Sequence, residues 1–420
     1  MAISRRQLLT STGLSLAAAA LPVRGEDAKP SEDNKAVATK PVAVRPPAHT
    51  LVVIQLAGGN DGLNTVPPMA DPLYKKLRPS LALAASEVLD LDGKLALHGA
   101  MNSLYARMKA KNDVAIITGV HYPKSNRSHF ESTAIWQTAR LQPHLEPEGW
   151  LGRAIEAPQR GHEPLGPFGL TSLGGGALTP VLFAEKLQAT VLSSLDAFAA
   201  QPDKKFPGDA PALLAALRAT YADGPGSFEE KVVRQVGEVA LASSTRLKEA
   251  AAGYQPMATF PKSGFGDQLK LASQLIASNL GVRVVHCTLG GFDTHGNQRP
   301  QQRNLLQGLS DGICALLDDV AAHNPGDRVT VMTYSEFGRR AAENGSGGTD
   351  HGSASVMFVA GAGVQGGLHG TPPDLSKLDG GDIPCTTDFR AVYASVIRDL
   401  LGEKPEKQLV QGLAPIKLFA

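Results

Sequence analysis

Continuous apolar runs alternate with amphipathic stretches along most of this chain. Several short runs are apolar at every position, which is typical of strands covered on both faces of a sheet. The runs predicted to be strands are His49–Leu56, Asp113–Val120, Val282–Leu289, Arg328–Thr333 and Ser355–Ala360, with shorter strands at Pro167–Leu170 and Pro180–Phe183.

Helical periodicity separates these strands. The predicted helices are Ala100–Lys109, Ser128–Arg140, Phe228–Ala252, Gln301–Ala322 and Asp388–Leu401. Strands that alternate with helices predict an α/β fold, in which a mostly parallel central sheet is covered by helices on both faces. Residues 210–280 are mostly helical, and we expect them to form either an inserted cap or an additional helical layer.

The composition agrees with this fold class. The chain has 420 residues, of which 42% are apolar and 5% aromatic, and its 44 glycines suit many tight strand-to-helix turns. The formal net charge of +1 gives no reason to expect a nucleic-acid partner. The three cysteines are widely separated, which argues against a disulfide framework and against a thiolate zinc site.

The first 47 residues are not expected to belong to the fold. Residues 4–9, Ser-Arg-Arg-Gln-Leu-Leu, form a twin-arginine motif, and the apolar run Leu14–Pro22 is too short to span a bilayer. Residues 1–25 are therefore predicted to be a signal peptide read by the twin-arginine translocase, and residues 26–47 a disordered linker. We expect a periplasmic or secreted protein, with residues 48–420 as a single domain and no transmembrane segment in the mature form.

Polar clusters follow four of the predicted strands. Because ligands collect beyond the carboxyl ends of strands in an open α/β sheet, we expect these clusters to lie near one another. Their oxygen and nitrogen donors, without thiolates, suit one or two divalent ions such as Zn²⁺, Mn²⁺, Mg²⁺ or Ca²⁺. The candidate metal ligands are Asp61, Asp293, His295, Glu336, Asp350 and His351.

The cluster after the second strand contains the candidate nucleophile, Ser128. The spacing of Ser128 and Glu131 also matches a capping box, so the serine could simply cap the helix that begins there. A helix N-terminus also favours negative charge, however, and can activate a serine beside a cation. Arg127 is the candidate group for holding a phosphate-like moiety during the reaction.

Four motifs together resemble one protein family. They are the segment Gly58–Asn64, the segment Arg127–Phe130, the segment Phe292–His295, and the segment Ser335–Arg339 with its continuation Gly348–Gly352. This set resembles the domain of unknown function 1501 (DUF1501) family, which looks like a remote member of the alkaline phosphatase superfamily. Sulfatases and cofactor-independent phosphoglycerate mutases belong to the same superfamily.

The resemblance implies an alkaline phosphatase-like fold and roles for particular residues. Asp61 would be the first-strand metal ligand, and Ser128, or alternatively Ser125, the nucleophile or anion-binding residue. Glu336 would replace the carboxylate of the superfamily's Asp-His pair, with His351 as its late histidine; alternatively, Asp350 and His351 are that pair. No Cys/Ser-x-Pro-x-Arg sequence occurs, which argues against a formylglycine-dependent sulfatase.

These observations predict an exported metal-dependent hydrolase that acts on a phosphate, sulfate or related ester of a small molecule or glycan. The expected substrate-binding residues are Asn64, Ser125, His129 and Arg339. The alternative is a non-catalytic envelope protein that binds a ligand or a metal on a degenerate form of the same fold.

Overall fold

The computed structural model describes residues 49–143, 148–156, 165–174, 176–185, 187–194, 207–222, 224, 226–326 and 328–420. The predicted signal peptide and linker lie outside the described residues. Within this part of the chain, no helix combines the length and the apolar character that a membrane span requires.

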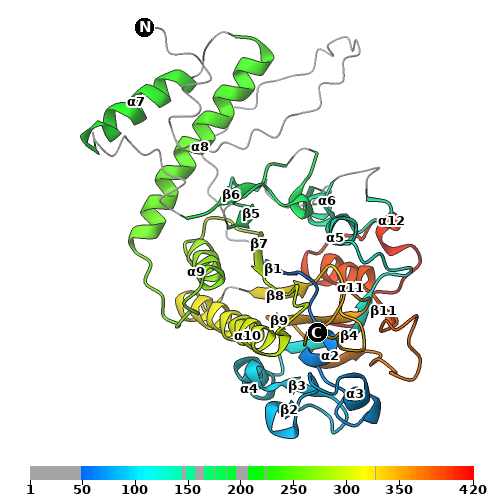
Figure 1. The fold of residues 1–420 in the computed structure, drawn as a ribbon. Helices are drawn as coiled ribbons and strands as arrows, with labels where there is room; N and C mark the ends of the chain where they lie inside the picture. Colours follow the sequence, from blue (N-terminus) through cyan, green and yellow to red (C-terminus); the bar gives the residue numbers. More distant parts are fainter. Residues whose placement is uncertain are drawn as a thin grey trace.

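A nine-stranded sheet organises the described chain (Figure 1). Its strands, in spatial order, are β10 (Gly367–Gly370), β4 (Val114–His121), β9 (Ser355–Gly361), β8 (Val329–Tyr334), β1 (Thr50–Ala57), β7 (Val284–Gly290), β5 (Leu170–Leu173) and β6 (Thr190–Leu192), with β11 (Thr387–Asp388) paired to β4. Among the described strands of this sheet, only β9 runs antiparallel to its neighbours, while β2 (Val88–Asp90) and β3 (Ala96–His98) form a separate antiparallel pair. The predicted α/β fold with a mostly parallel sheet is confirmed.

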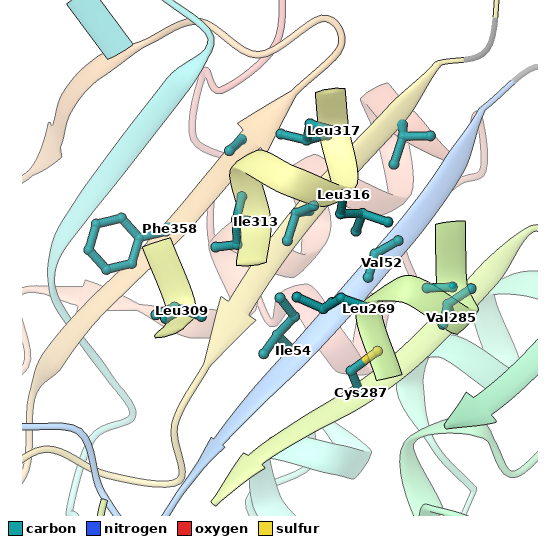
Figure 2. Packing of buried hydrophobic residues seen from close by; sticks show 14 of the residues in the cluster. Val52, Ile54, Leu269, Val285, Cys287, Leu309, Ile313, Leu316, Leu317 and Phe358 are labelled. Atoms are coloured by element: carbon teal, nitrogen blue, oxygen red, sulfur yellow. The ribbon is translucent and has the colours of Figure 1, made fainter. Parts of the chain in front are cut away.

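Helices cover both faces of this sheet, as the alternation of apolar and helical segments predicted. On one face lie α4 (Asn102–Lys111), α9 (Gly264–Ala277) and α10 (Gln298–His323), and on the other lie α5 (His129–Thr138), α6 (Trp150–Glu156) and α11 (Phe389–Ser395). Successive side chains of a strand point to opposite faces, so each strand contributes to two cores. Figure 2 shows Val52 and Ile54 of β1 packed against Leu269 of α9 and Leu316 of α10.

The predicted helical region contains two kinds of helix. α9 packs on the sheet, whereas α7 (Ala210–Tyr221) and α8 (Phe228–Ala252) pack on each other and project from the sheet in Figure 1. The bounds of α8 are those expected from its periodicity. The region therefore combines a layer helix with a projecting helical pair.

Some elements differ from the predictions. Pro180–Leu182 forms a 3₁₀ turn and not a strand, because Pro180 begins the segment and has no N–H to give to a sheet ladder. The predicted strand at 167–170 lies three residues later, and the C-terminal helix passes into a π-helical turn at Val396–Leu400. The elements not anticipated include α6, β6, β10 and β11, together with α2 (Gly62–Thr65), α3 (Pro72–Leu77), β2 (Val88–Asp90), β3 (Ala96–His98) and α12 (Lys407–Val410).

The strand directions bring four loops to one edge of the sheet. Ala57 at the end of β1 pairs with Gly290 at the end of β7, and β8 ends beside them at Tyr334. Because β9 is antiparallel, its first residue, Ser355, lies at this same edge opposite Val120 near the end of β4. The segment that precedes β9 therefore meets the segments that follow the parallel strands.

A buried carboxylate ties α10 to the helical region. Asp319 of α10 accepts hydrogen bonds from the hydroxyls of Tyr254 (2.7 Å) and Ser273 (2.5 Å) and from the backbone N–H groups of Met257 (2.6 Å) and Ala258 (3.0 Å). Burial alone would raise the pKa of Asp319, but these hydrogen bonds outweigh burial and lower the pKa below its usual range.

Replacing this carboxylate should destabilise the protein strongly. We expect Asp319→Ala to lower the free energy of unfolding at pH 7 by about 2–4 kcal/mol, because buried donors lose their acceptor. Since the pKa is lower in the folded state, the stabilisation is present at neutral pH and disappears as the pH falls below about 4. Urea unfolding at pH 7 and pH 3 measures both effects.

The matched control is Asp318→Ala, which removes the adjacent half-exposed carboxylate that pairs with Arg107 and Lys111. We expect this variant to change the free energy of unfolding by less than about 1 kcal/mol. Equal losses in the two variants would contradict the structural role of Asp319.

Candidate metal centre

The loops at the sheet edge approach one another through glycine. Gly58 has a φ of +117°, and a Cβ atom there would lie 2.4 Å from the backbone nitrogen of Asp293. The Gly58 N–H donates to Oε1 of Glu336 at 2.8 Å. A residue with a side chain at position 58 would therefore separate the loops after β1 and β7.

Three histidines converge on the carboxylate of Asp293. The Nε2 atoms of His295 and His351 each lie 3.0 Å from Oδ1, and they lie 2.9 Å from each other. The Nε2 atom of His129, at the start of α5, lies 3.6 Å from Oδ2. These four side chains come from the segments that follow β7, precede β9 and follow β4.

The opposite ring nitrogen of each histidine faces an acceptor. The partners of Nδ1 are Glu336 Oε1 for His129 (2.9 Å), the Arg127 carbonyl for His351 (3.0 Å) and Asp350 Oδ1 for His295 (3.3 Å). A carbonyl or carboxylate oxygen can only accept, so each Nδ1 carries the hydrogen of a neutral ring. Each Nε2 then presents its lone pair to the space beside Asp293.

Asp293 is held as a carboxylate in this arrangement. Burial raises its pKa, but the hydrogen bond from Arg339 and the positive charge of that guanidinium outweigh burial and lower the pKa to about 2. The Arg339 guanidinium lies 2.7 Å from Oδ1. Asp293 is therefore a carboxylate at neutral pH.

The donors fit a divalent cation. Lone pairs of two imidazoles and a carboxylate oxygen meet within about 3 Å without a hydrogen between them, which is unfavourable unless a cation lies among them. The donor atoms of His129, Asp293 and His351 lie within 4.8 Å of one another. Phe337 packs against the rings of His129 and His351, at centroid distances of 4.8 and 4.6 Å.

The six predicted metal ligands fall into three groups: three that meet in the cluster, two that lie behind it, and Asp61, which lies apart. Asp293, His295 and His351 meet in this cluster. Glu336 and Asp350 lie behind the histidine rings, where they bind the Nδ1 atoms of His129 and His295 and so orient these rings. His129, expected to bind substrate, also lies in this cluster, with its Nε2 atom facing Asp293.

Asp61 does not join the cluster, which corrects its predicted role as a ligand. Its side chain is buried and caps α2, and its other oxygen accepts from Arg78 at 2.5 Å and from the Gln298 amide. A carboxylate already neutralised by a buried guanidinium has no free oxygen for an ion. Neither Arg78 nor Gln298 stood out in the sequence, because nothing local links them to Asp61.

Asn64 and Arg339 also have structural contacts in place of the expected substrate contacts. Asn64 is buried, donates to the Leu81 carbonyl (2.9 Å) and accepts from the Tyr74 hydroxyl (2.7 Å). Arg339 is fully buried, and its donors are taken by Asp293 and by the backbone carbonyls of residues 58, 59, 292 and 349. Both side chains are therefore buried in contacts within the protein.

Ser128 lies between two residues of the cluster. The carbonyl of Arg127 binds His351, and His129 follows Ser128 directly. The serine is exposed at the N-cap of α5, yet its side chain makes no capping hydrogen bond, so the expected capping box is not formed. Ser125, the alternative, binds the buried His121 ring at 2.8 Å.

Arg127 is held by a carboxylate that the sequence did not single out. Its Nε donates to Oδ2 of the buried Asp382 at 2.9 Å, while the Arg127 side chain remains partly exposed. Asp382 follows Arg127 by more than 250 residues and comes from the loop before β11, so no local pattern connects the two.

Solved structures share only a distant likeness with this chain. The C-terminal periplasmic domain of EcEptC from Escherichia coli, crystallised with Zn, has 9% identity and a TM-score of 0.35 over 74% of this chain and 73% of that chain. An alkaline phosphatase from the Antarctic bacterium TAB5 has 9% identity and a TM-score of 0.31 over 77% and 95%. The PsFucS1 sulfatase from Pseudoalteromonas sp. has 11% identity and a TM-score of 0.32 over 84% and 67%.

The sequence itself gives a clearer relationship. No curated protein matches it. The model of the family described as "Protein of unknown function (DUF1501)" matches residues 48–379, which is most of the described chain, and the protein belongs to that family.

Proposed function

We propose that this protein is an exported, metal-dependent hydrolase of phosphate, sulfate or related esters. The observation that carries the proposal is the convergence of three Nε2 atoms on Asp293, each ring having its Nδ1 hydrogen bound elsewhere. An exposed hydroxyl without a capping bond, at the start of α5, lies beside this cluster.

His129, His295, His351 and Asp293 would hold the ion. A set rich in imidazole favours Zn²⁺, or Mn²⁺, over Mg²⁺ and Ca²⁺, which prefer oxygen donors. When bound, such an ion supplies a positive charge that favours a deprotonated hydroxyl and offsets the negative charge of the transition state.

Ser128 is the proposed nucleophile. Its Oγ would form a bond to phosphorus or sulfur and lose its proton to water, while the ester bond breaks and the alkoxide leaves with the electron pair and takes a proton from water. Water would then hydrolyse the seryl ester and restore the hydroxyl. The N-terminus of α5 carries the positive end of the helix dipole, which favours negative charge on Oγ and on the transferred group.

Arg127 would steady the transferred group. Its guanidinium is fixed by Asp382, and the part that remains exposed can approach a ligand oxygen beside Ser128. The same residue orients His351 through its carbonyl, so the binding of substrate and the geometry of the metal centre would depend on one segment of the chain.

Metal content is the first measurement. We expect the purified protein to contain tightly bound zinc or manganese, and His351→Ala to lose nearly all of it. Glu336→Gln, which weakens the contacts that orient His129 and hold the Gly58 N–H, should reduce metal affinity by about 10–100-fold. His369→Ala is the matched control, because this histidine lies on β10 and binds only a backbone carbonyl. Equal metal content in all variants would rule out the proposed centre.

Turnover tests the nucleophile separately. On a panel of aryl phosphates, phosphodiesters and aryl sulfates, Ser128→Ala should lower kcat by about 10³-fold or more while metal content stays unchanged. Ser125→Ala should have a much smaller effect, since that hydroxyl is engaged by His121. A protein that binds metal but turns over no ester, with or without Ser128, would instead be a non-catalytic binding protein.

Export depends on the twin-arginine motif in this proposal. Replacing Arg5 and Arg6 by lysine should trap the unprocessed precursor in the cytoplasm, because the translocase recognises the arginine pair. Cell fractionation with immunodetection measures this. The matched control replaces Lys35 and Lys40 of the predicted linker by arginine, which should leave export unchanged. Normal export of the Arg5/Arg6 variant would argue against this route.

A further inference from the structure

A polar cavity, separate from the histidine cluster, lies beside the first half of α10. It has a volume of about 720 Å³ and lies between α10, the turn Ala85–Glu87 and the start of α4. A smaller cavity of about 540 Å³ on the other side of α10 shares three of its residues, Asn304, Gln307 and Asp311. Neither cavity is lined by the histidines of the metal centre.

One wall of the larger cavity carries a buried histidine with a free donor. His98 is only 6% exposed, and its Nδ1 accepts from the Ala100 N–H at 3.0 Å. The ring hydrogen must therefore be on Nε2, for which the described part of the chain provides no hydrogen-bond partner. Burial, together with the charges of Arg303 and Arg299 and against that of Glu87, lowers the pKa of His98 to about 4. The ring stays neutral and offers one N–H to the cavity.

The charged residues around the cavity leave one cation available. Arg299 pairs with Glu87 at 2.5 Å, and Asp311 accepts from the Ser103 hydroxyl at 2.6 Å. Arg303, which is exposed and close enough to influence His98, forms no ion pair within the described residues. Arg303 and Asp311 are eight residues apart on α10, a rise of roughly 12 Å, so the two charged residues line the cavity from positions about two helical turns apart.

Two amide side chains line the cavity next to Arg303. Asn304 and Gln307 are exposed and lie one helical turn apart on α10, on the same side of the helix. An amide can donate and accept at once, which matches the hydroxyl groups of a polyol. A cavity of this size accommodates a ligand of one or two sugar rings.

We propose that this cavity binds a hydroxyl-rich ligand of sugar size that carries one oxyanion, with the anion at His98 and Arg303 and the hydroxyls at Asn304 and Gln307. A guanidinium beside a neutral N–H donor recognises a carboxylate or sulfate oxygen by charge and direction. This inference does not rest on the proposed hydrolase activity, because none of these residues belongs to the metal centre.

Calorimetry with the full chain tests the proposal. Glucuronate, glucose 6-sulfate and glucose are titrated into the wild type and into Arg303→Gln, which changes an exposed residue and should fold normally. We expect at least one of the two acidic sugars to bind at least about tenfold more tightly than glucose, and Arg303→Gln to remove at least about tenfold of that affinity. Comparing the two acids distinguishes a carboxylate site from a sulfate site.

The matched control is Arg246→Gln, an exposed arginine of α8 outside the cavity, which should bind like the wild type. Binding that survives Arg303→Gln but disappears in His351→Ala would belong to the metal centre and would overturn the proposal. So would the absence of binding by both acidic sugars at millimolar concentration, or equal binding of glucose and the acids.

Discussion

The buried guanidinium of Arg339 holds together the edge of the sheet at which the histidines meet. It bonds to backbone carbonyls of the loop after β1, the loop after β7 and the segment before β9, and to the carboxylate of Asp293. Those three loops are far apart in sequence, and polar carbonyls buried without a partner would each cost free energy. One planar group with five donors satisfies them together, which a lysine could not do. The position of Asp293 therefore follows from Arg339.

The direction of β9 is the second constraint. A fully parallel sheet would place the residues before a strand at the opposite edge from those that follow its neighbours. Because β9 runs antiparallel between β4 and β8, Asp350 and His351 arrive at the edge where β7 and β8 end. The short bridge between Arg339 and His351 then fixes the distance between the loops. Strand order thus turns two distant motifs into one cluster.

Much of the fold and of the candidate site can be predicted from the sequence, and there is a physical reason why the remaining contacts cannot. Buried strands and long helices leave a strong periodic signal, so β1, β4, β7, β8, β9 and α8 were predicted close to their bounds. The positions of Asp293, His295 and His351 after or before such strands identified a shared site. The sequence does not show which carboxylate meets a buried arginine, so Asp61 and Asn64 were given roles that Arg78 and Tyr74 exclude. Those pairings depend on tertiary contacts alone.

The contacts of the His129 ring also explain why its Nε2 atom faces Asp293 beside those of the other two histidines. Glu336 binds the Nδ1 atom of His129, and the ring packs against Phe337. Both contacts therefore oppose a rotation of the ring that would turn Nε2 away from Asp293. The same holds for His351, which the Arg127 carbonyl and Phe337 orient. Bringing lone pairs this close to a carboxylate is unfavourable by itself, and the hydrogen bonds around the rings offset that repulsion during folding. An arriving cation would then find its donors already in place, so little of its binding energy would be spent on ordering them.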